Sequence, residues 1–100
     1  MILIDDRLVS ESEARISYLD RGYCFGDGIY EVFRVYNGRL FEKEAHYERL
    51  ARSAREVKLP LPCSIGELDA RLSKLPALTG VREGTLYMQI TRGAAPRAHA

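Results

Sequence analysis

Residues 20–31 are the most informative stretch of this chain and read Asp-Arg-Gly-Tyr-Cys-Phe-Gly-Asp-Gly-Ile-Tyr-Glu. Repeated glycine indicates a backbone with unusual dihedral angles or a very close neighbour. A plain surface loop would not usually carry so many large rings. We therefore expect the stretch to contact a ligand or another part of the protein. Its glycines and aromatic residues alternate: Gly22, Tyr23, Phe25, Gly26, Gly28 and Tyr30.

The residues that follow this stretch predict a β-hairpin. Residues 29–36 are rich in β-branched and aromatic side chains, which favour a strand. Asn37-Gly38 is a strong hairpin signal, and residues 39–41 would form the return strand. Three further segments have the pattern of short strands: residues 2–4, 7–9 and 85–91.

Two segments in the middle of the chain predict helices. Residues 43–58 carry apolar side chains at helical spacing, and the Leu-Pro-Leu-Pro sequence at 59–62 would stop that helix. Ser64 and Glu67 form the pattern of a capping box for a second helix, and Pro76 follows its expected end. Strands with two helices between them predict an α+β fold, a small, mainly antiparallel sheet with the helices packed on one face.

Composition narrows the class of protein. The chain has 100 residues, enough for one domain, and 46% of them are hydrophobic, enough for a modest core. Fifteen basic and 14 acidic residues give a net charge of +1, so we expect neither nucleic acid nor an anionic membrane as a partner. Residues 1–4 are too short an apolar run for a signal peptide or a membrane span. Cys24 and Cys63 lack metal-ligand spacing, so we expect no metal site, and without a secretion signal we expect reduced thiols in the cytoplasm.

Arg97 and His99 are the sharpest candidates for a binding site. Pro96 favours an extended path, on which side chains two residues apart point to the same side. A guanidinium beside an imidazole makes a receptor for a carboxylate. The alternative is a solvated chain end.

Arg49 and Tyr30 are further candidates. Arg49 lies mid-helix, one turn from His46, and could bind a phosphate or extend its head group into solvent. Tyr30 would lie at the start of a strand beside the glycines, where its phenol could donate to a ligand or pack against a neighbouring strand.

Glu31 falls on the apolar side of the same strand. A carboxylate in that position must be paired or lie at an edge. The sequence offers Arg21 and Arg34 as partners without choosing between them.

Together these motifs resemble the class IV (fold type IV) pyridoxal-phosphate aminotransferases. Residues 20–32 resemble the N-terminal segment of that family, and His46 with Arg49-Leu50 resembles its helix motif. Ile90-Thr91-Arg92-Gly93, followed by Pro96-Arg97-Ala98-His99, resembles the D-amino-acid aminotransferase branch in particular. The resemblance covers essentially the whole chain.

The resemblance implies a role for each candidate residue. Arg49 would bind the phosphate of pyridoxal 5′-phosphate. Tyr30, Arg97 and His99 would bind the substrate carboxylate, with the Arg and the His supplied across the interface of a homodimer. The implied reaction moves an amino group between an amino acid, in this branch a D-amino acid, and a 2-oxo acid.

The sequence departs from the family in its length. Residues 1–100 would be the N-terminal small domain, and the lysine that carries the cofactor would lie in a C-terminal domain that this chain lacks. Lys43, Lys58 and Lys74 have the pattern of solvated surface lysines, so we expect the fragment alone to be inactive. The alternatives are an aminodeoxychorismate lyase, a branched-chain aminotransferase, or a non-catalytic α+β binding or assembly domain.

Overall fold

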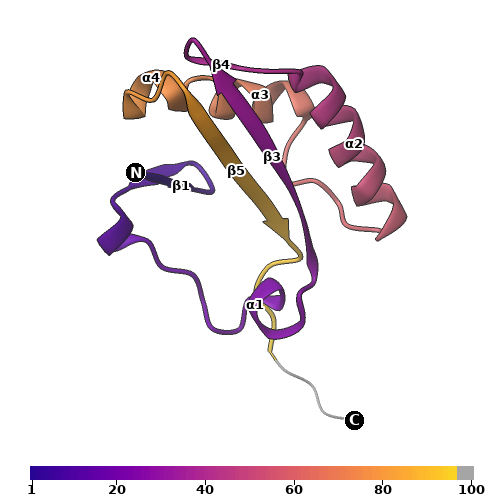
Figure 1. The fold of residues 1–100 in the computed structure, drawn as a ribbon. Helices are drawn as coiled ribbons and strands as arrows, with labels where there is room; N and C mark the ends of the chain where they lie inside the picture. Colours follow the sequence, from indigo (N-terminus) through magenta and orange to yellow (C-terminus); the bar gives the residue numbers. More distant parts are fainter. Residues whose placement is uncertain (97–100) are drawn as a thin grey trace.

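The computed structural model describes residues 1–96 and confirms the α+β class (Figure 1). Its strands form two small antiparallel sheets, β1–β2 and β4–β3–β5 in spatial order. The structure has two short helices that the sequence did not predict: α1 (Arg21–Phe25), which precedes β3, and α4 (Leu75–Thr79), which follows α3. The elements are β1 (Ile2–Ile4), β2 (Arg7–Val9), a 3-10 turn (Glu11–Glu13), α1 (Arg21–Phe25), β3 (Gly28–Tyr36), β4 (Arg39–Leu40), α2 (Lys43–Glu56), α3 (Ile65–Ser73), α4 (Leu75–Thr79) and β5 (Gly84–Thr91).

The three-stranded sheet is built around β3. The β3–β4 turn has φ 50° at Asn37 and 74° at Gly38, and positive φ at both central residues is what a tight two-residue hairpin requires. β5 pairs antiparallel with β3 from Gly28 opposite Thr91 to Val35 opposite Gly84. β4 pairs only with the last two residues of β3, so most of β3 has one open edge in the described part of the chain.

One face of this sheet carries the core. Every second residue of β3 from Ile29 to Val35 is buried, as the alternation of a strand requires. Phe33 and Leu50 are completely buried where α2 packs on β3. The core cluster also contains Leu68 and Leu72 of α3, so both predicted helices cover the same face. The opposite face is exposed and carries large side chains: Tyr30, Val32, Tyr36 and Tyr87.

The second predicted helix begins as expected. The Ser64 side chain accepts a hydrogen bond from the backbone N–H of Glu67 at 3.1 Å. Pro76 follows the end of α3 at Ser73, as predicted, and lies in the first turn of a further short helix, α4. Proline is compatible with a first turn because its missing N–H has no partner there in any helix.

The first predicted helix ends two residues early. α2 stops at Glu56 because Lys58 adopts a φ of 55°, which turns the chain before the prolines. Leu59 then folds back, donating to the carbonyl of Ala54 at 2.8 Å and burying its side chain. No helix within residues 1–96 has the length and apolar character to cross a membrane.

Candidate functional site

The glycine-rich stretch forms the short helix α1 and the turn into β3. Asp20 caps α1 by accepting a hydrogen bond from the N–H of Gly22 at 2.8 Å, and Gly26 ends it with a φ of 65°. Positive φ at the end of a helix favours glycine, which has no Cβ to clash. One of the three glycines is therefore required by its dihedral angle.

The other two glycines are required by a close neighbour, the end of β5. A Cβ on Gly22 would lie 2.3 Å from Cγ2 of Thr91. A Cβ on Gly28 would lie 2.8 Å from the carbonyl oxygen of Ile90. The sequence predicted that this stretch contacts a ligand or another part of the protein. The structure shows the second kind of contact, with the end of β5.

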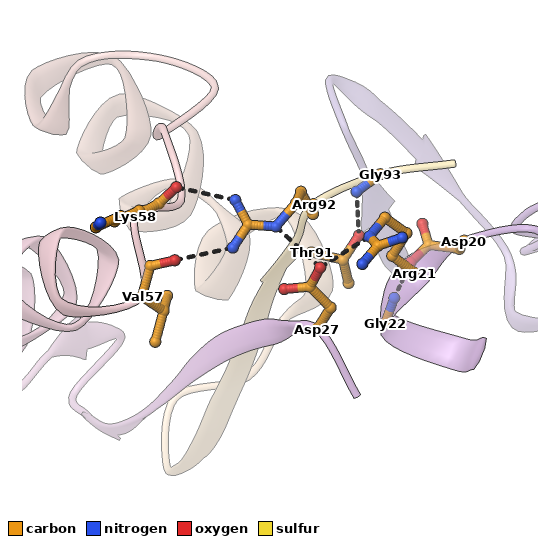
Figure 2. Close-up of polar contacts among 9 residues, drawn as sticks. All are labelled: Asp20, Arg21, Gly22, Asp27, Val57, Lys58, Thr91, Arg92 and Gly93. Carbon is orange, nitrogen blue, oxygen red and sulfur yellow. Dashed lines mark hydrogen bonds and ion pairs between the residues drawn. The ribbon is translucent and has the colours of Figure 1, made fainter. Parts of the chain in front are cut away.

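Asp27 joins this stretch to the end of β5 (Figure 2). Its Oδ2 atom accepts hydrogen bonds from Nε of Arg21 and Nε of Arg92, both at 2.9 Å. The other two nitrogens of the Arg92 guanidinium donate to the carbonyls of Lys58 and Val57, each at 2.9 Å. Hydrogen bonds from Arg92 and Arg21 lower the pKa of Asp27 below its ordinary value of 3.8. Arg92 thus connects the turn after α1, the end of β5 and the residues just after α2.

The chain beyond β5 is held against the residues before β3. Its main-chain contacts are the Arg21–Gly93 hydrogen bond at 2.8 Å, the Ala95–Leu19 hydrogen bond at 3.4 Å and the Asp20–Ala94 bridge. The predicted carboxylate-binding residues Arg97 and His99 follow at once in the sequence. They lie outside the described residues, so their roles stay predictions.

A second polar cluster lies where α2 packs on β3. Arg49 donates from Nη2 to Oε1 of Glu31 at 2.8 Å and from Nε to Oε2 at 2.9 Å. His46, one turn earlier on α2, places Nδ1 2.7 Å from the same Oε1. Because a carboxylate only accepts, this His nitrogen carries the proton in that contact. The suggestion that Arg21 or Arg34 pairs with Glu31 is wrong, because Arg21 binds Asp27 and the side chain of Arg34 stacks on Tyr36.

This cluster is buried at Glu31 and exposed to solvent at Arg49. The Glu31 side chain is 5% exposed and that of Arg49 is 55% exposed. Burial raises the pKa of Glu31, but the hydrogen bonds from Arg49 and His46 outweigh it and hold the pKa below 4.5. The same contact raises the pKa of Arg49. The structure therefore presents a half-exposed cation, oriented by Glu31, where α2 packs on β3.

Tyr30 lies on the exposed face, since consecutive strand residues point to opposite sides. Its ring stacks on that of Tyr87, with centroids 5.6 Å apart and the planes 20° apart. The Tyr87 hydroxyl donates to Gln89 at 3.0 Å. Tyr87 was not among the residues predicted to form the site, although the alternation of β5 places it on this face.

A shallow hollow of about 280 Å³ lies beside Arg49 on the surface of α2. Arg49 binds Glu31 through Nε and Nη2, which leaves its Nη1 for a second anion. A half-exposed guanidinium with a second arginine one turn away is a donor set that suits a phosphate group. The residues lining the hollow are Ala45, His46, Glu48, Arg49 and Arg52.

No lysine lines this hollow, and residues 1–96 contain no group of His, Cys, Asp and Glu arranged to hold a metal ion. Lys43 binds Asp69 of α3 at 3.2 Å, which also accepts from the Tyr47 hydroxyl at 2.9 Å. Lys43 is therefore part of the packing of α2 on α3.

Comparison with known families decides the assignment. The family model described as amino-transferase class IV matches residues 28–100. The chain belongs to the class IV aminotransferase family. A curated member, the D-alanine aminotransferase of Staphylococcus aureus (strain N315), is 50% identical over 99 residues, which are 99% of this chain and 35% of the relative. The chain thus spans about a third of the length of that aminotransferase.

Solved structures of class IV aminotransferase relatives share the fold. A 4-amino-4-deoxychorismate lyase from Pseudomonas aeruginosa matches with 32% identity and a TM-score of 0.74, over 87% of this chain and 31% of its own. A branched-chain aminotransferase from Thermoproteus uzoniensis matches with 32% identity and a TM-score of 0.71, over 85% and 30%. A hypothetical aminotransferase from Mycobacterium tuberculosis in a PLP-bound form matches with 27% identity and a TM-score of 0.77, over 90% and 32%.

Proposed function

We propose that this chain is the small domain of a pyridoxal-phosphate-dependent aminotransferase that moves amino groups between D-amino acids and 2-oxo acids. The observation that carries this proposal is the half-exposed guanidinium of Arg49, held by Glu31 where α2 packs on β3. Family membership and the 50% identity to a D-alanine aminotransferase support the reaction and the substrate class.

Arg49 would hold the phosphate group of the cofactor. Its contacts to Glu31 use one edge of the guanidinium, so the other side is available to a phosphate oxygen. Arg52, one turn further along α2, adds positive charge to the same hollow. Pyridoxal phosphate, when bound, supplies an electron sink for the charge that develops at the α-carbon of the amino acid.

Tyr30, Arg97 and His99 would bind the carboxylate of the substrate. Tyr30 offers a phenol donor on the exposed face of the sheet. Arg97 would grip both carboxylate oxygens and His99 would add a donor, reaching the site from the other subunit of a homodimer. The Asp27–Arg92 contact would fix where the segment that carries them begins.

The remaining machinery would lie in the part of a full-length enzyme that this chain does not contain. The chain spans 35% of the S. aureus relative. We place the lysine that bonds to the cofactor in the larger remaining portion, and we expect the isolated chain not to transaminate. The homodimer is proposed from the resemblance to the family, and the cytoplasmic location from the reduced cysteines that the sequence predicts.

Two family activities compete with this assignment. The lyase and the branched-chain aminotransferase each match with 32% identity, against 50% for the D-alanine aminotransferase. A non-catalytic binding or assembly role would keep the scaffold and need none of the exposed polar groups. The half-exposed Arg49 and the exposed Tyr30 favour a catalytic domain.

A chimera tests the assignment. This chain replaces the segment of the S. aureus D-alanine aminotransferase that aligns with it, and amino transfer is measured from D-alanine and from L-valine, together with cleavage of 4-amino-4-deoxychorismate. We expect transfer from D-alanine to dominate. A folded chimera that prefers L-valine, that cleaves 4-amino-4-deoxychorismate, or that has no activity would contradict the proposal.

A substitution at Arg97 tests whether this chain contributes to D-alanine binding in the chimera. We expect Arg97→Gln in the chimera to raise KM for D-alanine on the order of 10- to 100-fold, because a charged hydrogen bond to the substrate is lost. The matched control is Arg82→Gln, which removes an equal charge from an exposed arginine that binds Asn37 beside the β3–β4 turn. Equal KM values in the two variants would show that Arg97 does not bind the carboxylate.

A further inference from the structure

We propose that Glu31 is a positioning residue that sets the plane of the Arg49 guanidinium so that its Nη1 side meets a phosphate group. This inference rests on the proposed role of Arg49 and adds a residue that does not touch the phosphate itself. It assigns a purpose to a buried carboxylate that packing alone does not explain.

Glu31 occupies a costly position. It lies in the core-facing row of β3 between Ile29 and Phe33, and its side chain is 5% exposed. Removing a carboxylate from water is expensive, and a buried ion pair often stabilises a fold no better than well-packed apolar side chains would. Stability is therefore a weak explanation for a glutamate here.

The contacts of Glu31 restrict Arg49 in orientation as well as in place. Both carboxylate oxygens accept from the arginine, Oε1 from Nη2 at 2.8 Å and Oε2 from Nε at 2.9 Å. Two parallel bonds fix the plane of a guanidinium, whereas one bond would let it rotate. His46 donates to Oε1 at 2.7 Å and so holds the carboxylate from a second side.

Fixing Arg49 in advance would favour binding. A free arginine side chain has many rotamers, and ordering it on binding costs free energy that a pre-oriented side chain has already lost. Arg49 is 55% exposed, so without Glu31 its head group would be free to rotate in solvent.

Charge alone predicts the opposite effect. The negative Glu31 carboxylate lies 2.8 Å from the cation and repels a phosphate. If only charge matters, removing that negative charge strengthens phosphate binding. If positioning matters, removing it weakens binding, so the sign of the change separates the two explanations.

The experiment measures dissociation constants of the chimera described above for pyridoxal 5′-phosphate and for pyridoxal, which lacks the phosphate. We expect Glu31→Gln and Glu31→Asp each to weaken binding of pyridoxal 5′-phosphate about tenfold and to leave pyridoxal binding unchanged. Asp is one methylene too short to keep both bonds, although it keeps the charge. The control Asp69→Asn disturbs the packing of α2 on α3 without touching Arg49 and should change neither constant.

The outcomes separate this inference from the proposed function. If Arg49→Gln leaves the affinity for pyridoxal 5′-phosphate unchanged, the proposed role of Arg49 fails. If Arg49→Gln weakens it but Glu31→Gln has no effect or tightens it, only the positioning role fails. Equal weakening of pyridoxal and pyridoxal 5′-phosphate by Glu31→Gln would also overturn the inference, because the effect would then be structural.

A second measurement does not depend on the chimera. In the 100-residue chain, NMR exchange of the Arg49 Nε proton with water should be slow and should accelerate at least severalfold in Glu31→Gln, because this proton donates to the carboxylate. The Nε proton of Arg52 serves as an internal reference. Fast exchange of the Arg49 proton in the unchanged chain would overturn the proposal.

Discussion

Nε of Arg92 lies 2.9 Å from Oδ2 of Asp27, although 65 residues separate them in the sequence. Arg21 binds the same oxygen, and the rest of the Arg92 guanidinium reaches the carbonyls at the end of α2. The glycine-rich stretch that stands out in the sequence thus fixes the end of β5. The segment with the predicted carboxylate-binding residues starts from this point.

Gly22→Ala should destabilise the chain. The new Cβ would lie 2.3 Å from Cγ2 of Thr91, a distance that forces α1 away from β5. We expect a loss of about 1–3 kcal/mol in the free energy of unfolding, measured by urea denaturation. Thr91→Ser removes Cγ2 and keeps the hydroxyl that accepts from Gly93, so the double variant should recover part of the loss.

Gly66→Ala is the matched control. Gly66 lies in α3, and the nearest atom to its new Cβ would be 3.9 Å away. Replacing an exposed helical glycine by alanine should stabilise by about 0.5–1 kcal/mol. Equal effects of the two substitutions would show that α1 does not pack on β5 as described.

Asp27→Asn should loosen the chain beyond β5. The substitution removes the charge that receives hydrogen bonds from Arg21 and Arg92. Amide exchange of the Arg21 N–H, which donates to Gly93, should become faster by NMR. Asp6→Asn, in the β1–β2 turn, makes the same charge change and should leave that proton unaffected.

Glu31→Gln should lower stability at neutral pH and matter less in acid. The pKa of Glu31 in the folded chain lies below 4.5, so its pairing with Arg49 stabilises the fold above that pH and is lost as the pH falls further. We expect the unchanged chain to be more stable than the variant by about 1–3 kcal/mol at neutral pH. Urea unfolding as a function of pH should show this difference shrinking below pH 4.5. A constant difference would contradict the ion pair.

Tyr47→Phe should remove one tyrosine that ionises only at high pH, when the chain unfolds. Burial and the neighbouring Asp69 raise the pKa of Tyr47 above its ordinary value of 10.0, so the phenol keeps its proton in the folded chain. That contribution to stability is present below pH 10.0 and is lost as the pH rises above it. Ultraviolet titration should show one of the six tyrosines ionising only on unfolding, and this step should vanish in Tyr47→Phe. The lost hydrogen bond to Asp69 should cost about 1 kcal/mol.

The elements of the fold were largely predictable because their signals are local. The alternation of residues 29–36, the Asn37-Gly38 turn and the Ser64 cap each depend on neighbours in sequence, and each was confirmed. The end of α2 was misplaced because the turn at Lys58 has no local signal that distinguishes it from one more helical residue.

The candidate site was only partly predictable because its contacts are long-range. His46 and Arg49 were recognised as lying on one side of a helix, but their shared partner Glu31 comes from a strand 15 and 18 residues earlier. The packing of Gly22 against Thr91 was likewise invisible, since nothing near Gly22 in sequence specifies β5. The prediction that the core-facing Glu31 must be paired was correct. Its partners, His46 and Arg49, are basic residues of the next predicted helix.

The affinity ratio between pyridoxal 5′-phosphate and pyridoxal tests the central claim, that Arg49 binds the phosphate of the cofactor. It is measured in the chimera with Arg49 intact, with Arg49→Gln, and with Arg55→Gln as a control from the same helix, outside the hollow. We predict that Arg49→Gln lowers the preference for the phosphorylated form about 10- to 100-fold, with a much smaller effect of Arg55→Gln. An unchanged preference in Arg49→Gln would contradict the account.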